Sequence, residues 1–156
     1  MPARFVDCPE GVLSISDAEY FWVHPVEVSL AAPARLRMSV VEDGGVREVR
    51  LLPEGVGVAT RELVEELLLD QCVVFVCDRD SWVRALRASS DEAYAAYRDA
   101  LYTSPGTYGV SFEGCPDGVC FPASGRRCDV YALRDVKGDI VGADIVARAD
   151  DLQSPT

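Results

Sequence analysis

The chain has 156 residues, of which 49% are hydrophobic and 26% charged, a balance typical of a soluble globular domain. Its net charge of −11 argues against a nucleic-acid backbone as partner, because phosphate binding requires clustered lysines and arginines. The sequence contains no apolar run of about 18 residues or more, so we expect no transmembrane segment. Residues 1–10 lack the pattern of a secretory signal, which predicts synthesis in the cytoplasm.

The first predicted element is a β-hairpin near the N-terminus. Phe5-Val6 and residues 12–15 flank Pro9-Glu10-Gly11, a turn sequence whose glycine adopts a positive φ at little cost. Successive side chains of a strand point to opposite faces. We therefore expect Leu13 and Ile15, the larger apolar pair, to face the core.

The clearest strand pattern is a second hairpin at residues 35–52. Its two arms, residues 35–41 and 46–52, place apolar side chains among charged ones, and Gly44-Gly45 supplies the turn. This pattern predicts one face in the core and one face in water.

Two helices are predicted in the middle of the chain. Residues 60–71 begin with Thr60 as a candidate N-cap and carry an apolar face at helical spacing, formed by Leu63, Val64, Leu67 and Leu68. The second helix begins at Ser89, the first residue of a capping box, and ends at residues 104–106.

The remaining segments predict strands, including the apolar stretch at residues 72–77 and most of the last third of the chain. The predicted fold class is therefore α+β, with a mostly antiparallel sheet and two helices inserted midway. We expect a single domain over residues 1–150 and a polar C-terminal tail over residues 151–156.

Tyr20, Phe21 and Trp22 form a run of aromatic residues in a predicted strand. They cannot all point inward, because successive side chains alternate between the two faces of a strand. Exposed aromatic residues are common anchors in protein interfaces, so these residues are a candidate interaction surface. Coverage by a helix or the tail is the alternative.

Asp78 and Asp80 directly follow an apolar strand and form a D-x-D pair. Such pairs hold Mg²⁺ in some transferases, because hard cations prefer clustered oxygen ligands. The chain lacks the glycine-rich phosphate loop and nearby lysine that would support phosphoryl transfer. We favour acids that are solvated or cap the next turn, and keep a small metal-dependent enzyme as the alternative.

Six cysteines are present, and no secretory signal accompanies them, which favours reduced thiols over disulfides. The pairs Cys72/Cys77 and Cys115/Cys120 are spaced more widely than most zinc-binding pairs. We expect no cofactor and no metal, with a zinc-stabilised binding module as the alternative that also uses Cys8 and Cys128.

Three stretches, in order along the chain, resemble a single protein family. Residues 5–20 read F-V-x-x-P-x-G-V-L-x-I-x-D-x-x-Y, residues 73–80 read VVFVCDRD, and residues 96–108 read AYRDALYTSPGTY. Together they resemble the poxvirus family of MHC class II antigen presentation inhibitors. Residues 31–52 share only the hydrophobic pattern. The arginine-rich, lysine-poor composition is typical of a GC-rich poxvirus genome.

This resemblance implies a viral immune-evasion protein, made early and contributing to virulence. It would reduce MHC class II-restricted antigen presentation through contacts with host proteins of that pathway. The resemblance implies a location in the host cell cytoplasm, or on endosomes of antigen-presenting cells. It maps no catalytic residue onto the chain, so we expect a protein that is not an enzyme.

Overall fold

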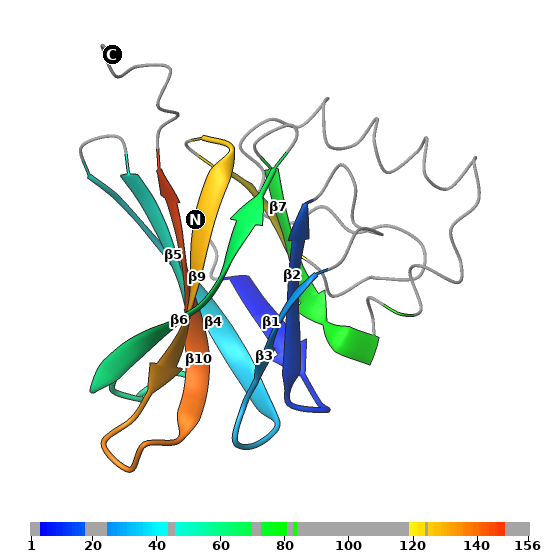
Figure 1. The fold of residues 1–156 in the computed structure, drawn as a ribbon. Coiled ribbons are helices and arrows are strands. Elements are labelled where there is room, and N and C mark those ends of the chain that lie inside the picture. Colours follow the sequence, from blue (N-terminus) through cyan, green and yellow to red (C-terminus); the bar gives the residue numbers. More distant parts are fainter. Residues whose placement is uncertain are drawn as a thin grey trace.

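The computed structural model describes residues 4–17, 25–43, 46–69, 73–80, 83, 119–123 and 125–148. These residues are almost entirely β-structure (Figure 1). The described strands are β1 (Arg4–Cys8), β2 (Val12–Asp17), β3 (Val26–Ser29), β4 (Ala34–Asp43), β5 (Val46–Leu52), β6 (Thr60–Leu68), β7 (Val73–Asp78), β8 (Val119–Pro122), β9 (Arg127–Arg134) and β10 (Ile140–Arg148).

The strands form two antiparallel sheets that pack face to face as a β-sandwich. Sheet A has six strands in the order β1-β4-β5-β10-β9-β6, and sheet B has four in the order β3-β2-β7-β8. Every described pairing within the two sheets is antiparallel. No helix within the described part of the chain is long and apolar enough to cross a membrane.

The α+β prediction is wrong for the residues that the structure describes. Residues 60–68, predicted as a helix, form β6 and pair with β9 over their whole length. A β-bulge between Leu63 and Glu65 shifts the alternation by one residue, so the apolar positions mimic helical spacing. Pairing with β9 outweighs this local preference. The predicted helix that begins at Ser89 lies outside the described residues.

The prediction of an opening hairpin is correct for its turn and wrong for its strand pairing. The predicted turn is present: Gly11 has a φ of 75° and donates its N–H to the Cys8 carbonyl oxygen at 3.1 Å. However, β1 pairs with β4, whereas β2 pairs with β3 and β7. The turn therefore connects β1 in sheet A to β2 in sheet B. These two strands bury their apolar side chains in the same core from opposite sides.

The hairpin formed by β4 and β5 is confirmed. Met38 lies opposite Leu51 and Val40 lies opposite Val49 in this antiparallel pair. Leu51 and Val49 are fully buried, whereas Arg37 and Ser39 on the opposite face are exposed. The predicted turn residues Gly44 and Gly45 lie outside the described residues.

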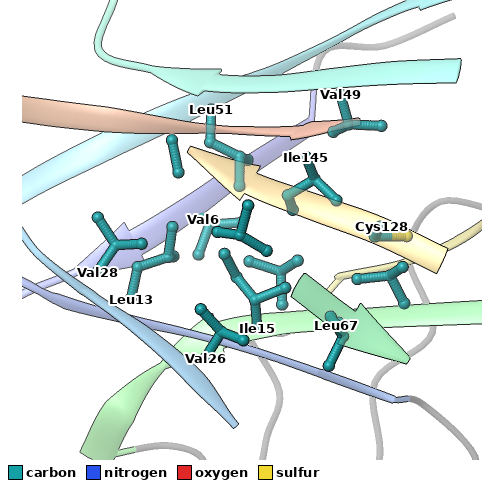
Figure 2. Close-up of a cluster of buried hydrophobic side chains, with 14 of the residues drawn as sticks. Val6, Leu13, Ile15, Val26, Val28, Val49, Leu51, Leu67, Cys128 and Ile145 are labelled. Atoms are coloured by element: carbon teal, nitrogen blue, oxygen red, sulfur yellow. The ribbon is translucent and has the colours of Figure 1, made fainter. Parts of the chain in front are cut away.

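The core lies between the two sheets and is built mainly from aliphatic side chains (Figure 2). Leu13 and Ile15 are both fully buried in it, as predicted. Burial of each such side chain contributes about 1.5 to 3 kcal/mol to folding. Sheet A and sheet B both contribute to the cluster, through Val6, Leu13, Ile15, Val26, Val28, Val49, Leu51, Leu67, Cys128 and Ile145.

The faces of the two sheets that point away from this core differ in character. On sheet B, the outward-facing residues Ser14, Ser16, Phe75 and Cys77 are buried. On sheet A, the corresponding face carries arginines and carboxylates that reach solvent. We call this surface the outer face of sheet A, and it is the accessible broad face of the described sandwich.

Candidate functional site

The outer face of sheet A is centred on Asp144, an acidic residue in the otherwise apolar stretch of residues 140–147 in strand β10. Strand pairing places Asp144 opposite Arg50 of β5 on one side and opposite Tyr131 of β9 on the other. Arg61 comes from β6, one strand beyond β9. Strands β5, β10 and β9 and the edge strand β6 therefore bring these four residues together on one face.

The carboxylate of Asp144 is fully buried and bound by two arginines. Arg50 donates from Nε to Oδ1 and from Nη2 to Oδ2, both at 2.8 Å, in a bidentate pair. Arg61 donates from Nη1 to Asp144 Oδ2 at 3.2 Å. The two arginine side chains are 39% and 42% exposed, so they cover the carboxylate while remaining accessible themselves.

Arg61 is held in place by two further contacts. Its Nη1 donates to Glu48 Oε1 at 2.8 Å, and its guanidinium lies 4.3 Å from the centre of the Tyr131 ring. A guanidinium over an aromatic face is attracted by the ring quadrupole. With one nitrogen engaged by two carboxylates, Arg61 keeps its Nε and Nη2 N–H groups free of hydrogen bonds to any described residue.

The charge state of the cluster follows from these contacts. Burial alone would raise the pKa of the Asp144 carboxyl, but the hydrogen bonds and charge of Arg50 outweigh it, with a smaller contribution from the hydrogen bond of Arg61. The pKa of Asp144 is therefore held below its ordinary value, and the group is ionised at neutral pH. Two carboxylates and two guanidinium groups balance, so the cluster is locally neutral.

A second arginine–aromatic pair lies at the β1 end of the same face. The Arg35 guanidinium lies 4.2 Å from the centre of the Phe5 ring, and its Nε lies 3.5 Å from Asp7 Oδ1. These side chains are more exposed than the central cluster, with Arg35 66% exposed. The outer face of sheet A thus carries the same combination, an arginine between an aromatic ring and a carboxylate, at two places.

This arrangement presents groups that can bind another molecule. Arginine and tyrosine are enriched among the residues that contribute most to binding in protein interfaces. A guanidinium fixed by its own carboxylate loses little conformational freedom when a partner binds. Its remaining N–H donors match a carboxylate or a carbonyl group of that partner.

Asp78 and Asp80, the predicted alternative metal pair, have different environments. Asp78 is 2% exposed at the end of β7, and its Oδ2 accepts a hydrogen bond from the backbone N–H of Asp80 at 3.0 Å. Asp80 is exposed. The Asp78 carboxylate thus hydrogen-bonds to the backbone of the residues that follow β7. Within the described ranges, no group of three potential ligands is close enough to hold a metal ion.

The cysteines are buried where the structure describes their side chains, namely at Cys8, Cys77 and Cys128. Burial, together with the nearby charges of Asp78 and Asp7, raises the pKa of the Cys8 thiol to about 12. Cys8 is therefore a protonated, unreactive core residue at neutral pH. Cys72 and Cys115 lie outside the described residues.

Tyr20, Phe21 and Trp22, the predicted interaction surface, also lie outside the described residues. The cluster around Asp144 was not predicted from the sequence. One signal for it exists: Asp144 is an acidic residue within the apolar stretch of residues 140–147, and a buried charge requires a partner. The sequence does not show which arginine supplies that partner.

Comparison with known proteins adds no relative: no family model, curated protein or solved structure matches this chain. The resemblance of the three sequence stretches to the poxvirus inhibitors of class II presentation therefore stays a prediction.

Proposed function

We propose that this chain is a viral immune-evasion protein that reduces MHC class II-restricted antigen presentation by binding a host protein. The outer face of sheet A, centred on Arg50, Arg61 and the buried Asp144, is the binding surface in this proposal. The observation that carries it is the pair of accessible guanidinium groups locked onto a fully buried carboxylate. The pathway itself is supported by the sequence resemblance alone.

The chemistry of this face indicates what a partner presents. The Nε and Nη2 groups of Arg61, which donate to no described residue, suit a carboxylate, and Leu63 next to Tyr131 offers an exposed apolar contact. A partner with an acidic side chain beside an apolar one fits both features. The contact is made without a catalytic step, since the arginines stabilise charge but contribute no nucleophile or general base.

The enzyme alternative has weaker support. It requires Asp78 to hold a metal ion, whereas the described contacts of this carboxylate include the backbone N–H of Asp80. An asparagine can accept the same hydrogen bond through its side-chain oxygen. The replacements Asp78→Asn and Asp80→Asn should therefore leave suppression of antigen presentation intact if the protein folds.

The decisive experiment compares Arg61→Glu with Lys137→Glu in antigen-presenting cells that express the protein. Both variants make the same change in charge, but Lys137 lies in the exposed turn between β9 and β10. T-cell activation by a class II-restricted peptide is the measurement, with expression level and melting temperature as folding controls. We expect Arg61→Glu to lose suppression and Lys137→Glu to retain it.

The same two variants are tested by co-precipitation of host proteins from those cells. Loss of an interface arginine commonly weakens binding about tenfold to a hundredfold, so the captured partner should disappear with Arg61→Glu. Full suppression by a normally folded Arg61→Glu protein would exclude the outer face of sheet A as the binding surface. Absence of suppression by the unmodified protein would overturn the proposed pathway.

A further inference from the structure

Strand β6 ends sheet A and is exposed along most of its length. It pairs with β9 on one side, and no described strand pairs with its other side. Residues 60–66 are all exposed, including those that point to the core side of the sheet. Only Leu67, near the end of the strand, is buried in the core. The first two thirds of β6 therefore present a backbone edge and both side-chain faces to solvent.

The two faces of this exposed strand differ in chemistry. Leu63 and Leu68 lie on the outer face of sheet A, and they are 56% and 63% exposed. Glu62 and Glu65 point to the opposite face, because they lie opposite Ala132 and Val130, two inward-facing residues of β9. The bulge between Leu63 and Glu65 is what keeps both leucines on one face. The outer face of this edge is thus mixed, because Arg61 and Glu66 lie on it together with the two leucines, whereas the opposite face carries Glu62 and Glu65.

A second copy of this chain gains no net charge complementarity at this edge. In two β6 strands paired antiparallel around Leu63 and Val64, Arg61 of one copy lies opposite Glu66 of the other, but Glu62 lies opposite Glu65. Like charges directly opposite each other destabilise a pair of strands. Acidic residues and a bulge on an edge strand are features that oppose self-association. A strand with basic residues at those positions has the complementary charge.

We propose that β6 accepts an extended basic segment of a partner protein as an additional strand of sheet A. In such a segment, lysines or arginines alternate with apolar residues. The basic side chains pair with Glu65 and with Glu62, whose Oε1 already accepts a hydrogen bond from Arg134 Nη2 at 3.4 Å, and the apolar side chains pack on Leu63 and Leu68. Backbone hydrogen bonds to the edge that no described strand covers supply affinity, and the alternating side chains supply selectivity. This inference goes beyond the proposed function and does not depend on the cluster around Asp144.

The probe for this proposal is a fluorescent octapeptide of alternating lysine and valine, titrated into the purified protein at about 0.15 M salt. The control is the same peptide with every internal amide N-methylated, which keeps the charge but removes the backbone donors. We expect saturable binding of the first peptide and binding weaker by about tenfold or more for the second. Equal binding of the two peptides overturns the proposal, because attraction to an acidic protein would then explain both.

Two further measurements separate the edge from the rest of the surface. Glu65→Gln should weaken binding of the unmodified peptide. Asp139→Asn in the β9–β10 turn makes an equal change in charge and should leave this binding unchanged. Hydrogen exchange on the unmodified protein should show peptide-dependent protection of amides in residues 60–66, and protection elsewhere only would overturn the proposal. A dimer in light scattering that Glu65→Lys dissociates would also overturn it, since the occupant would then be a second copy. These readouts use no cells, so failure of the proposed immune function leaves them unaffected.

Discussion

Removal of the Asp144 carboxylate is the most informative perturbation of the outer face. The contacts of Asp144 determine how much stability this change should remove. The carboxylate accepts two charge-assisted hydrogen bonds from Arg50 at 2.8 Å and one from Arg61 at 3.2 Å. Hydrogen bonds to charged groups contribute about 1.5 to 3 kcal/mol each when well formed. Solvent reaches both arginines, which reduces their share of this energy. We expect Asp144→Ala to lower the free energy of unfolding by about 3 kcal/mol.

A double-mutant cycle measures the interaction between Asp144 and Arg50 separately from the cost of leaving either charge without its partner. Asp144→Ala, Arg50→Ala and the double variant are unfolded in urea at neutral pH, and their unfolding free energies are compared. We expect a coupling of about 1.5 to 3 kcal/mol between Asp144 and Arg50. The same cycle with Arg61→Ala should give about 0.5 to 1 kcal/mol, because Arg61 makes one longer contact and is more exposed.

The pH dependence gives a second test with a defined sign. Because the folded-state pKa of Asp144 is lowered, its contribution is fully present above the unfolded pKa, about 3.9. That contribution is lost as the pH falls through the lower folded-state pKa. The stability difference between the unmodified protein and Asp144→Ala should therefore shrink below about pH 4. A coupling near zero, or a difference that does not change with pH, would refute the assignment of Asp144 as the anchor of this face.

Other features of the structure give further predictions. Leu13→Ala should lower the unfolding free energy by about 2 to 5 kcal/mol, because the side chain is fully buried. Ser14→Ala should change it by less than about 0.5 kcal/mol, since the buried Ser14 hydroxyl lacks a hydrogen-bond partner among the described residues. Urea unfolding of the two variants measures both changes. Gly142→Ala should cost about 2 kcal/mol or more, because its Cβ would overlap the Leu51 carbonyl oxygen, and an unchanged melting temperature would contradict this. The Cys8 thiol should react with a disulfide reagent at pH 8 only after unfolding, as peptide mass mapping would show. A chelator should leave the melting temperature unchanged; a fall of many degrees would support the zinc alternative.

Several features follow from local sequence and were predictable for that reason. The alternation at residues 35–41 and 46–52 specifies a hairpin, because a strand with one buried face requires a period of two. Leu13 and Ile15 enter the core by the same rule. Gly11 marks a turn because a positive φ is strained for other residues. Each of these depends only on neighbouring residues.

Three other features depend on contacts between distant parts of the chain. Residues 60–68 form a strand because they pair with β9 along their length. The bulge between Leu63 and Glu65 shifts the alternation by one residue, so the apolar positions have the spacing of a helix. The turn at Gly11 joins two sheets, since β4 and β7 take β1 and β2 as partners. Asp144 meets Arg50 across a separation of 94 residues, which strand order alone brings together. Local propensity specifies how a segment bends and which side chains alternate, whereas the energy of pairing and burial decides which segments become neighbours.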